Sequence, residues 1–134
     1  GRDLWNRRTE LFPRLDFCVV VERQVCELTG NESFFQHVVT ALARLDRALR
    51  DWTSGPLHPG MASSVESRQT MDHADYGPMR RFACPDGQER DFSNHLKLYS
   101  CNFRIHYFER QELAGGRAFV AYVGVHLPTV RYRT

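Results

Sequence analysis

The chain has 134 residues, which is enough for one domain that buries its own core without disulfide staples. Hydrophobic residues make up 42% of it and charged residues 25%, an ordinary composition for a soluble domain, and no apolar run is long enough for a membrane span. The four cysteines form no CxxC pair and have no histidine at zinc-finger spacing. We therefore expect a single domain over residues 1–134, whole or cut from a larger protein, that is cytoplasmic and has no cofactor, structural metal or membrane partner.

Charge is unevenly distributed along the chain. Residues 1–78 carry 9 basic and 11 acidic groups, whereas residues 79–134 carry 9 basic and 5 acidic groups. A local excess of +4 favours a polyanionic partner, RNA or DNA, for the C-terminal half. Seventeen of the 18 basic residues are arginines, a bias typical of a GC-rich, bacterial genome.

The first 52 residues form the helical part. Residues 3–15 indicate a short helix or an irregular lead-in interrupted by Pro13, and residues 19–28 indicate a helix that ends before Gly30. Residues 31–52 carry apolar side chains spaced alternately three and four apart, which predicts a long amphipathic helix. Its buried stripe is expected to contain Phe35, Val38, Leu42, Leu45, Leu49 and Trp52.

Residues 53–78 are rich in glycine, proline and serine and break this pattern. A connection of that length without its own structure is unusual in a compact domain. Two interpretations stay open: a short helix around 61–69, or a functional loop lying across the sheet.

The remaining residues, 79–134, predict a basic β-meander. Strands are expected near 79–84, 88–92, 94–99, 103–108 and 117–126, with a hairpin turn at 85–88. Helices followed by strands indicate an α+β fold, in which the N-terminal helices pack on a four- to five-stranded, mainly antiparallel sheet. The chain is expected to leave this sheet after Pro128.

Alternation along these strands separates an apolar face from a cationic face. Leu96, Leu98, Phe103, Ile105 and Tyr107 are expected to face the helices. In the last strand the same face is expected to hold Phe119, Ala121, Val123 and Val125.

The opposite face gathers the candidate functional residues. Histidines with a pKa near 6.5 can move protons, and cations can stabilise a charged phosphorane, which are the needs of a metal-independent ribonuclease. A set of solvated polar residues on a half-buried sheet would have the same pattern. The proposed catalytic residues are His95, His106, Lys97 and Arg104, and the proposed nucleic-acid-binding residues are Arg81, Tyr99, Tyr122, His126, Arg131 and Arg133.

Other chemistries have no linear signature here. The sequence lacks a GxSxG elbow, a P-loop, GxGxxG and HExxH, and no Ser-His-Asp order is visible. Glu89, Asp91 and Glu109 are not expected to converge as a metal cage. The sequence therefore gives no support to a serine nucleophile, nucleotide hydrolysis or a two-metal nuclease.

Two segments resemble the RelE/ParE-type toxin fold: "HLKLYSCNFRIHYF" and the closing "FVAYVGVH", within about residues 79–128. The resemblance implies a compact domain whose sheet grips RNA, with a protein inhibitor as partner. Arg104, His106 and Tyr107 would occupy the matching strand, with His95 and Lys97 on the preceding one. The 78 residues before this region, the single lysine and the tail from His126 depart from that family's pattern.

We expect an RNA-directed, toxin-like domain that acts as a metal-independent endoribonuclease. One alternative is a non-catalytic recognition module, for a nucleic acid or a protein partner, fused to the effector domain of a larger defence-type protein. Another is an inhibitor or immunity protein whose basic face binds an acidic partner.

Overall fold

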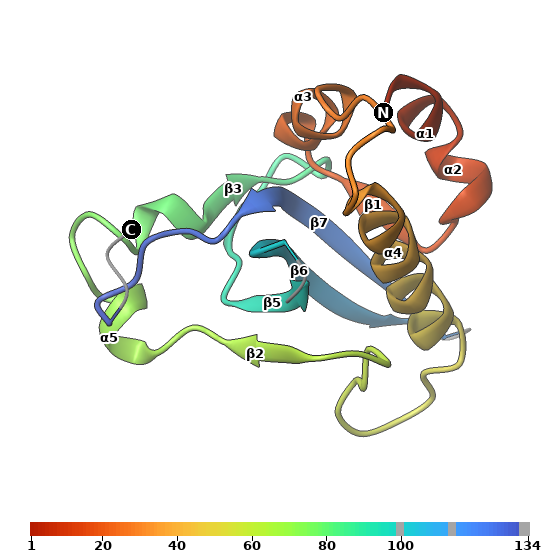
Figure 1. Cartoon of the computed structure of the whole chain (residues 1–134). Helices are drawn as coiled ribbons and strands as arrows, with labels where there is room; N and C mark the ends of the chain where they lie inside the picture. Colours follow the sequence, from red (N-terminus) through yellow and green to blue (C-terminus); the bar gives the residue numbers. More distant parts are fainter. Residues whose placement is uncertain (99–100, 113–114, 132–134) are drawn as a thin grey trace.

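The computed structural model describes residues 1–98, 101–112 and 115–131. Within these ranges an α+β fold is formed, with helices on one face of a mainly antiparallel sheet (Figure 1). The helices are α1 (Arg2–Asn6), α2 (Arg8–Leu11), α3 (Val19–Cys26), α4 (Phe35–Arg50) and α5 (Arg68–Met71), with a 3-10 turn η1 (Pro78–Arg80). The strands are β1 (Leu15–Phe17), β2 (Ser63–Val65), β3 (Arg81–Ala83), β4 (Glu89–Asp91), β5 (Asn94–Leu98), β6 (Phe103–Glu112) and β7 (Gly115–Val125).

The main sheet has the strand order β1-β7-β6-β5-β2. Its centre is the predicted antiparallel meander β5-β6-β7, while β1 joins β7 in parallel at one edge and β2 joins β5 antiparallel at the other. The hairpin β3-β4 forms a separate two-stranded sheet. The predicted fold class is confirmed, and the described residues add two short edge strands that the sequence pattern did not indicate.

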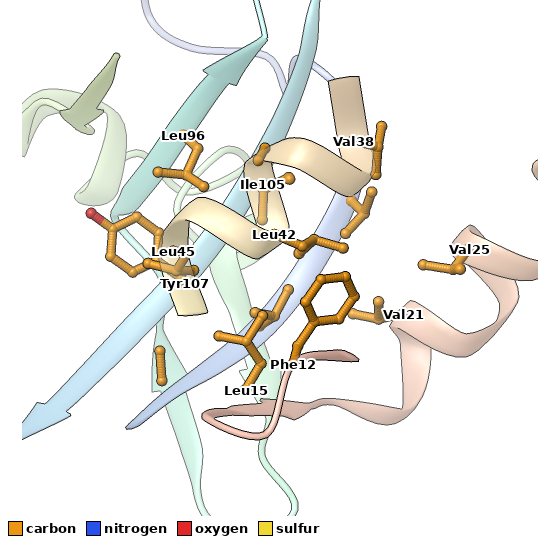
Figure 2. Close-up of a cluster of buried hydrophobic side chains, with 14 of the residues drawn as sticks. Phe12, Leu15, Val21, Val25, Val38, Leu42, Leu45, Leu96, Ile105 and Tyr107 are labelled. Atoms are coloured by element: carbon orange, nitrogen blue, oxygen red, sulfur yellow. The ribbon is translucent and has the colours of Figure 1, made fainter. Parts of the chain in front are cut away.

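Helix α4 covers one face of the sheet and supplies the centre of the core. Leu45 and Leu49 are fully buried, and Figure 2 shows Leu42 and Leu45 of α4 in one cluster with Ile105 of β6. The helix begins at Phe35 rather than at residue 31. The Glu32 carboxylate accepts hydrogen bonds from the backbone N–H groups of residues 29 and 30, at 2.9 and 3.0 Å, and this turn delays the helix start.

Hairpin β3-β4 covers part of the opposite face. Phe92 is completely buried there against Phe119 and Ala121 of β7, and the buried thiols of Cys18 and Cys84 complete this second cluster. The sheet is therefore enclosed on both sides near β7, and only part of the second face is left for polar side chains.

A β-bulge in β7 changes which side chains of that strand face each of the two hydrophobic clusters. Ile105 pairs with Val123 and Tyr107 pairs with Val120, so β7 has one more residue than β6 over this interval. The predicted common face for the apolar residues of β7 is therefore wrong: Val123 lies in the core against the helices, whereas Phe119 and Ala121 lie in the opposite cluster. Val125 is 56% exposed, because the strand reaches the end of the sheet there.

Residues 53–78 contain both β2 and α5 rather than one helix around 61–69. Strand β2 has only three residues, too few to give a readable alternation, and it forms because β5 offers an unpaired edge. The other edge strand, β1, is fixed by Asp16, whose carboxylate accepts hydrogen bonds from Arg110 and Arg117 at 2.5 and 2.7 Å. Both edges depend on partners that are distant in the sequence.

Across the described residues, no helix is both long and apolar enough to cross a membrane.

Candidate functional site

A cavity of about 320 Å³ lies where the polar side of β2, β5 and β6 meets α5 and the C-terminal tail. It contains one carboxylate, three cations and two imidazoles, together with several hydroxyl groups. The charged and imidazole residues are Glu66, His95, Lys97, Arg104, His126 and Arg131, and the hydroxyl residues are Ser64, Ser67, Thr70 and Thr129. Five of the ten predicted site residues therefore line one cavity.

Cross-strand register brings the strand residues of this cavity together. Lys97 on β5 lies directly opposite Arg104 on β6, and His95 lies opposite Ser64 on β2. Side chains of directly opposed residues project from the same face with Cβ atoms about 5 Å apart. The predicted grouping of His95, Lys97 and Arg104 on one face is confirmed.

The tail after β7 forms another wall. His126 donates its backbone N–H to the Asn102 carbonyl at 3.0 Å, and the Val130 N–H bonds the Thr70 hydroxyl at 3.2 Å. Figure 1 shows this tail running from the end of β7 to the neighbourhood of α5. The tail thus covers this end of the sheet face, which is not an open surface.

A buried ion pair fixes Glu66, the carboxylate that lines the cavity. Arg80 is 1% exposed, and its Nε lies 2.6 Å from Oε2 of Glu66, whose side chain is 6% exposed. Arg80 also donates to the carbonyls of Tyr76 and Leu127, so the guanidinium ties η1 to the tail. Neither Arg80 nor Glu66 was among the predicted site residues, because no local sequence pattern indicates burial of either.

His95 connects this ion pair to a hydroxyl group. Its Nε2 lies 3.0 Å from Oγ of Ser64, and its Nδ1 lies 3.5 Å from Oε1 of Glu66. Nδ1 makes no hydrogen bond to any described residue, so the carboxylate is near but not bonded. A proton on Nδ1 would face the carboxylate and leave Nε2 to accept from the serine hydroxyl.

Burial and nearby cations lower the pKa of both cavity histidines. Burial, followed by the charges of Arg104 and Lys97, lowers the pKa of His95 to about 4. The pKa of His126 is also lowered, first by burial and then by Arg104. An anion bound at Lys97 and Arg104 would oppose this cationic field and make both imidazoles easier to protonate.

His106 does not line the cavity. Only 1% of it is exposed, and its Nδ1 donates a hydrogen bond to the Phe92 carbonyl at 2.9 Å. Burial lowers its pKa to about 3. Its ring lies between those of His95 and Tyr122, with centroid distances of 5.1 and 5.5 Å. The expected position of His106 on an exposed working surface is wrong, because hairpin β3-β4 and the segment that follows it cover this part of the sheet.

The remaining predicted residues lie elsewhere. Arg81 is exposed on the β3-β4 hairpin and pairs with Asp91 at 3.1 Å, outside the cavity. Tyr122 donates its hydroxyl to the Val125 carbonyl at 2.6 Å. Tyr99 and Arg133 lie outside the described residues.

A larger, more open cavity of about 510 Å³ lies at the C-terminal end of α4, lined by Arg44, Arg47, Trp52 and His58 among others. The smaller cavity is the better catalytic candidate, because it has a buried histidine that is hydrogen-bonded to a hydroxyl and lies close to a carboxylate. Within the described parts of the chain, no three His, Cys, Asp or Glu side chains are grouped to hold a metal ion.

No family model matches the chain, and neither a curated protein nor a solved structure shows significant similarity to it.

Proposed function

We propose that this cavity binds a phosphodiester of RNA and cleaves it without a metal ion, so that the protein is a toxin-like endoribonuclease. The carrying observation is the cross-strand pair of Lys97 and Arg104 in one cavity with two imidazoles, those of His95 and His126. Two adjacent cations can hold the non-bridging oxygens of a phosphate and stabilise the added charge of the phosphorane. The excess of basic residues after residue 78 supports the same polyanionic substrate.

The proton transfers need one neutral and one protonated imidazole. His95 and the Ser64 hydroxyl bonded to it would accept the proton of the ribose 2′-OH as that oxygen attacks phosphorus. His126, half-buried at the end of β7, would give a proton to the departing 5′ oxygen. Lys97 and Arg104 oppose protonation of His126. The negative charge of a bound phosphate would offset these cations and raise the pKa of His126, so that the imidazole is protonated and can act as the acid.

Arg131 lines the same cavity and would extend the phosphate-binding surface along the RNA backbone. His106 has a supporting role in this proposal. It orients Phe92 and packs beside the His95 ring, and it does not touch the substrate.

Cleavage of a single-stranded RNA oligonucleotide in excess chelator tests this proposal. Activity should persist, leave a 2′,3′-cyclic phosphate and show a bell-shaped pH profile. His126→Ala should lower the rate about 10²–10⁴-fold while RNA binding is nearly retained. His37→Ala is the matched control, because His37 is an exposed histidine on α4.

Absence of cleavage by the parent protein between pH 5 and 8, or full activity of His126→Ala, would rule the ribonuclease out.

A second candidate, a non-catalytic recognition module for RNA, DNA or a protein partner, is favoured by the lowered pKa values of both cavity histidines. Weakly basic imidazoles are poor proton acceptors, but a neutral cavity wall does not hinder anion binding. This alternative predicts salt-sensitive binding of RNA or DNA with no cleavage at any pH. A protein inhibitor or a fused effector domain, the partners expected from the sequence, is compatible with either candidate function.

A further inference from the structure

The cavity contains a hydroxyl nucleophile of its own. Ser64 Oγ lies 3.0 Å from Nε2 of His95, and Oε1 of Glu66 lies 3.5 Å from the other ring nitrogen. A hydroxyl, an imidazole and a carboxylate in this order are the parts of an activated serine, and such distances are often loose before substrate binds. The linear sequence gave no sign of this arrangement, because the three residues come together only when β2 pairs with β5.

We propose that Ser64 is a nucleophile for phosphodiesters that lack a neighbouring 2′-OH, such as those of DNA, with His95 as its base and Glu66 as the residue that orients the base. The proposal rests on the proposed function only in requiring that the cavity hold a phosphodiester. A ribonuclease takes its nucleophile from the substrate, whereas this reaction takes it from the protein.

Ser64 and the buried His95 line the cavity together. His95 is 4% exposed, and its Nε2 is engaged by the serine hydroxyl, so Ser64 is the hydroxyl placed for activation by this imidazole. The carboxylate behind the imidazole is fixed by Arg80, which is itself buried. A fixed carboxylate 3.5 Å from Nδ1 favours the tautomer with its proton on Nδ1, which leaves Nε2 to act as the base.

Ser67, another serine of this cavity, is engaged differently. Its Oγ accepts the Thr70 N–H at 3.1 Å as the N-cap of α5 and also donates to the Thr70 hydroxyl. No imidazole contacts it among the interactions of the described residues. Ser64 is therefore the serine with a base.

The reaction proceeds in two balanced steps. In the first, a bond forms from Ser64 Oγ to phosphorus, the Oγ proton passes to Nε2 of His95, and the bond from phosphorus to one ester oxygen breaks, releasing an alcohol that takes a proton from His126. In the second, water bonds to phosphorus and gives a proton to His126, the bond from phosphorus to Ser64 Oγ breaks, and protonated His95 returns its proton to Oγ, which releases a phosphomonoester. Lys97 and Arg104 stabilise the added negative charge in both steps.

An alkyl fluorophosphonate probe isolates the first step, because fluoride departs without a proton. The intact protein is treated with the probe, and the modified peptide is identified by mass spectrometry. A single adduct on Ser64 is expected, absent in Ser64→Ala and formed at least 10-fold more slowly in His95→Gln. Ser63→Ala is the matched control: Ser63 precedes Ser64 on β2, so its side chain points to the opposite face, and its labelling should match the parent.

No adduct on Ser64 in the folded protein, or equal labelling of Ser64→Ala, would overturn the proposal. The RNA assay separates the two reactions. Parent protein that yields 2′,3′-cyclic phosphate from RNA but forms no adduct with the probe would leave the ribonuclease intact and refute the serine nucleophile. An adduct on Ser64 without cleavage of RNA would support the serine nucleophile and refute the ribonuclease.

Discussion

The two faces of the sheet are built by different means. The face under α4 is filled by aliphatic and aromatic side chains, with Leu42, Leu45 and Ile105 all 0–1% exposed. The other face buries a guanidinium, a carboxylate and two imidazoles at one end, and an apolar cluster beneath β3-β4 at the other. Only the first face resembles an ordinary core.

The apolar face contributes stability, whereas the polar end of the other face supplies groups that can bind or react. Apolar side chains stabilise the fold by leaving water and need no particular partner. Buried polar groups cost free energy unless each one finds a hydrogen bond, so Arg80 and Glu66 are useful only as a pair. The polar end of the sheet therefore keeps groups that can bind or react, at a cost that the apolar core must offset.

Removing one member of the buried ion pair should have the largest effect on stability. Arg80→Ala leaves the Glu66 carboxylate buried without its partner, and the free energy of unfolding should fall by about 3–5 kcal/mol. Urea unfolding measures this loss. The adjacent Arg81→Ala is the control, because the exposed pair of Arg81 with Asp91 should contribute about 0–1 kcal/mol. Equal effects of the two substitutions would mean that the two faces do not differ as described.

Truncating a buried side chain on the face under α4 should destabilise the fold. Leu45→Ala should lower the free energy of unfolding by about 2–5 kcal/mol, because Leu45 is fully buried between α4 and the sheet. Val125→Ala, at the exposed end of β7, should change it by less than about 0.5 kcal/mol. A large loss at Val125 would restore the original prediction that it belongs to the core.

The polar face should make the fold sensitive to acid. In the folded protein the pKa is about 4 for His95 and about 3 for His106, below the usual 6.5 of a histidine. As the pH falls, these two imidazoles therefore bind protons in the unfolded chain before they do so in the folded protein. Each should therefore lower the free energy of unfolding by about 1.4 kcal/mol per pH unit below pH 6.5, until its folded pKa is reached. His106→Asn should remove one such contribution. Stability that is independent of pH between 6.5 and 4.5 would contradict this.

The smallest effect concerns the cations at the cavity. Lys97→Gln and Arg104→Gln should each reduce the slope of log affinity against log salt by about one unit for single-stranded RNA, since each removes about one phosphate contact. Arg68→Gln is the control, because Arg68 is an exposed arginine of α5 paired with Asp72. Binding that does not depend on salt would favour a protein partner over a nucleic acid.

Sequence periodicity determined much of this fold. Helix α3, predicted over residues 19–28, the long amphipathic α4 and the meander β5-β6-β7 were predicted because each repeats a period of 3.6 or 2 over enough residues to be read. The same alternation placed His95, Lys97 and Arg104 on one face, since register between neighbouring strands follows from their turn.

Tertiary structure decided the rest. The bulge in β7 redistributes Phe119, Ala121 and Val123 between two cores, and a single extra residue has no signature in an alternating pattern. Edge strand β2 forms only because β5 is available, and with it the contact of Ser64 with His95. Burial of Arg80 and His106 depends on segments that fold back over the sheet from distant positions. Periodicity specifies which way a side chain points, whereas what covers it is fixed only when the whole chain packs.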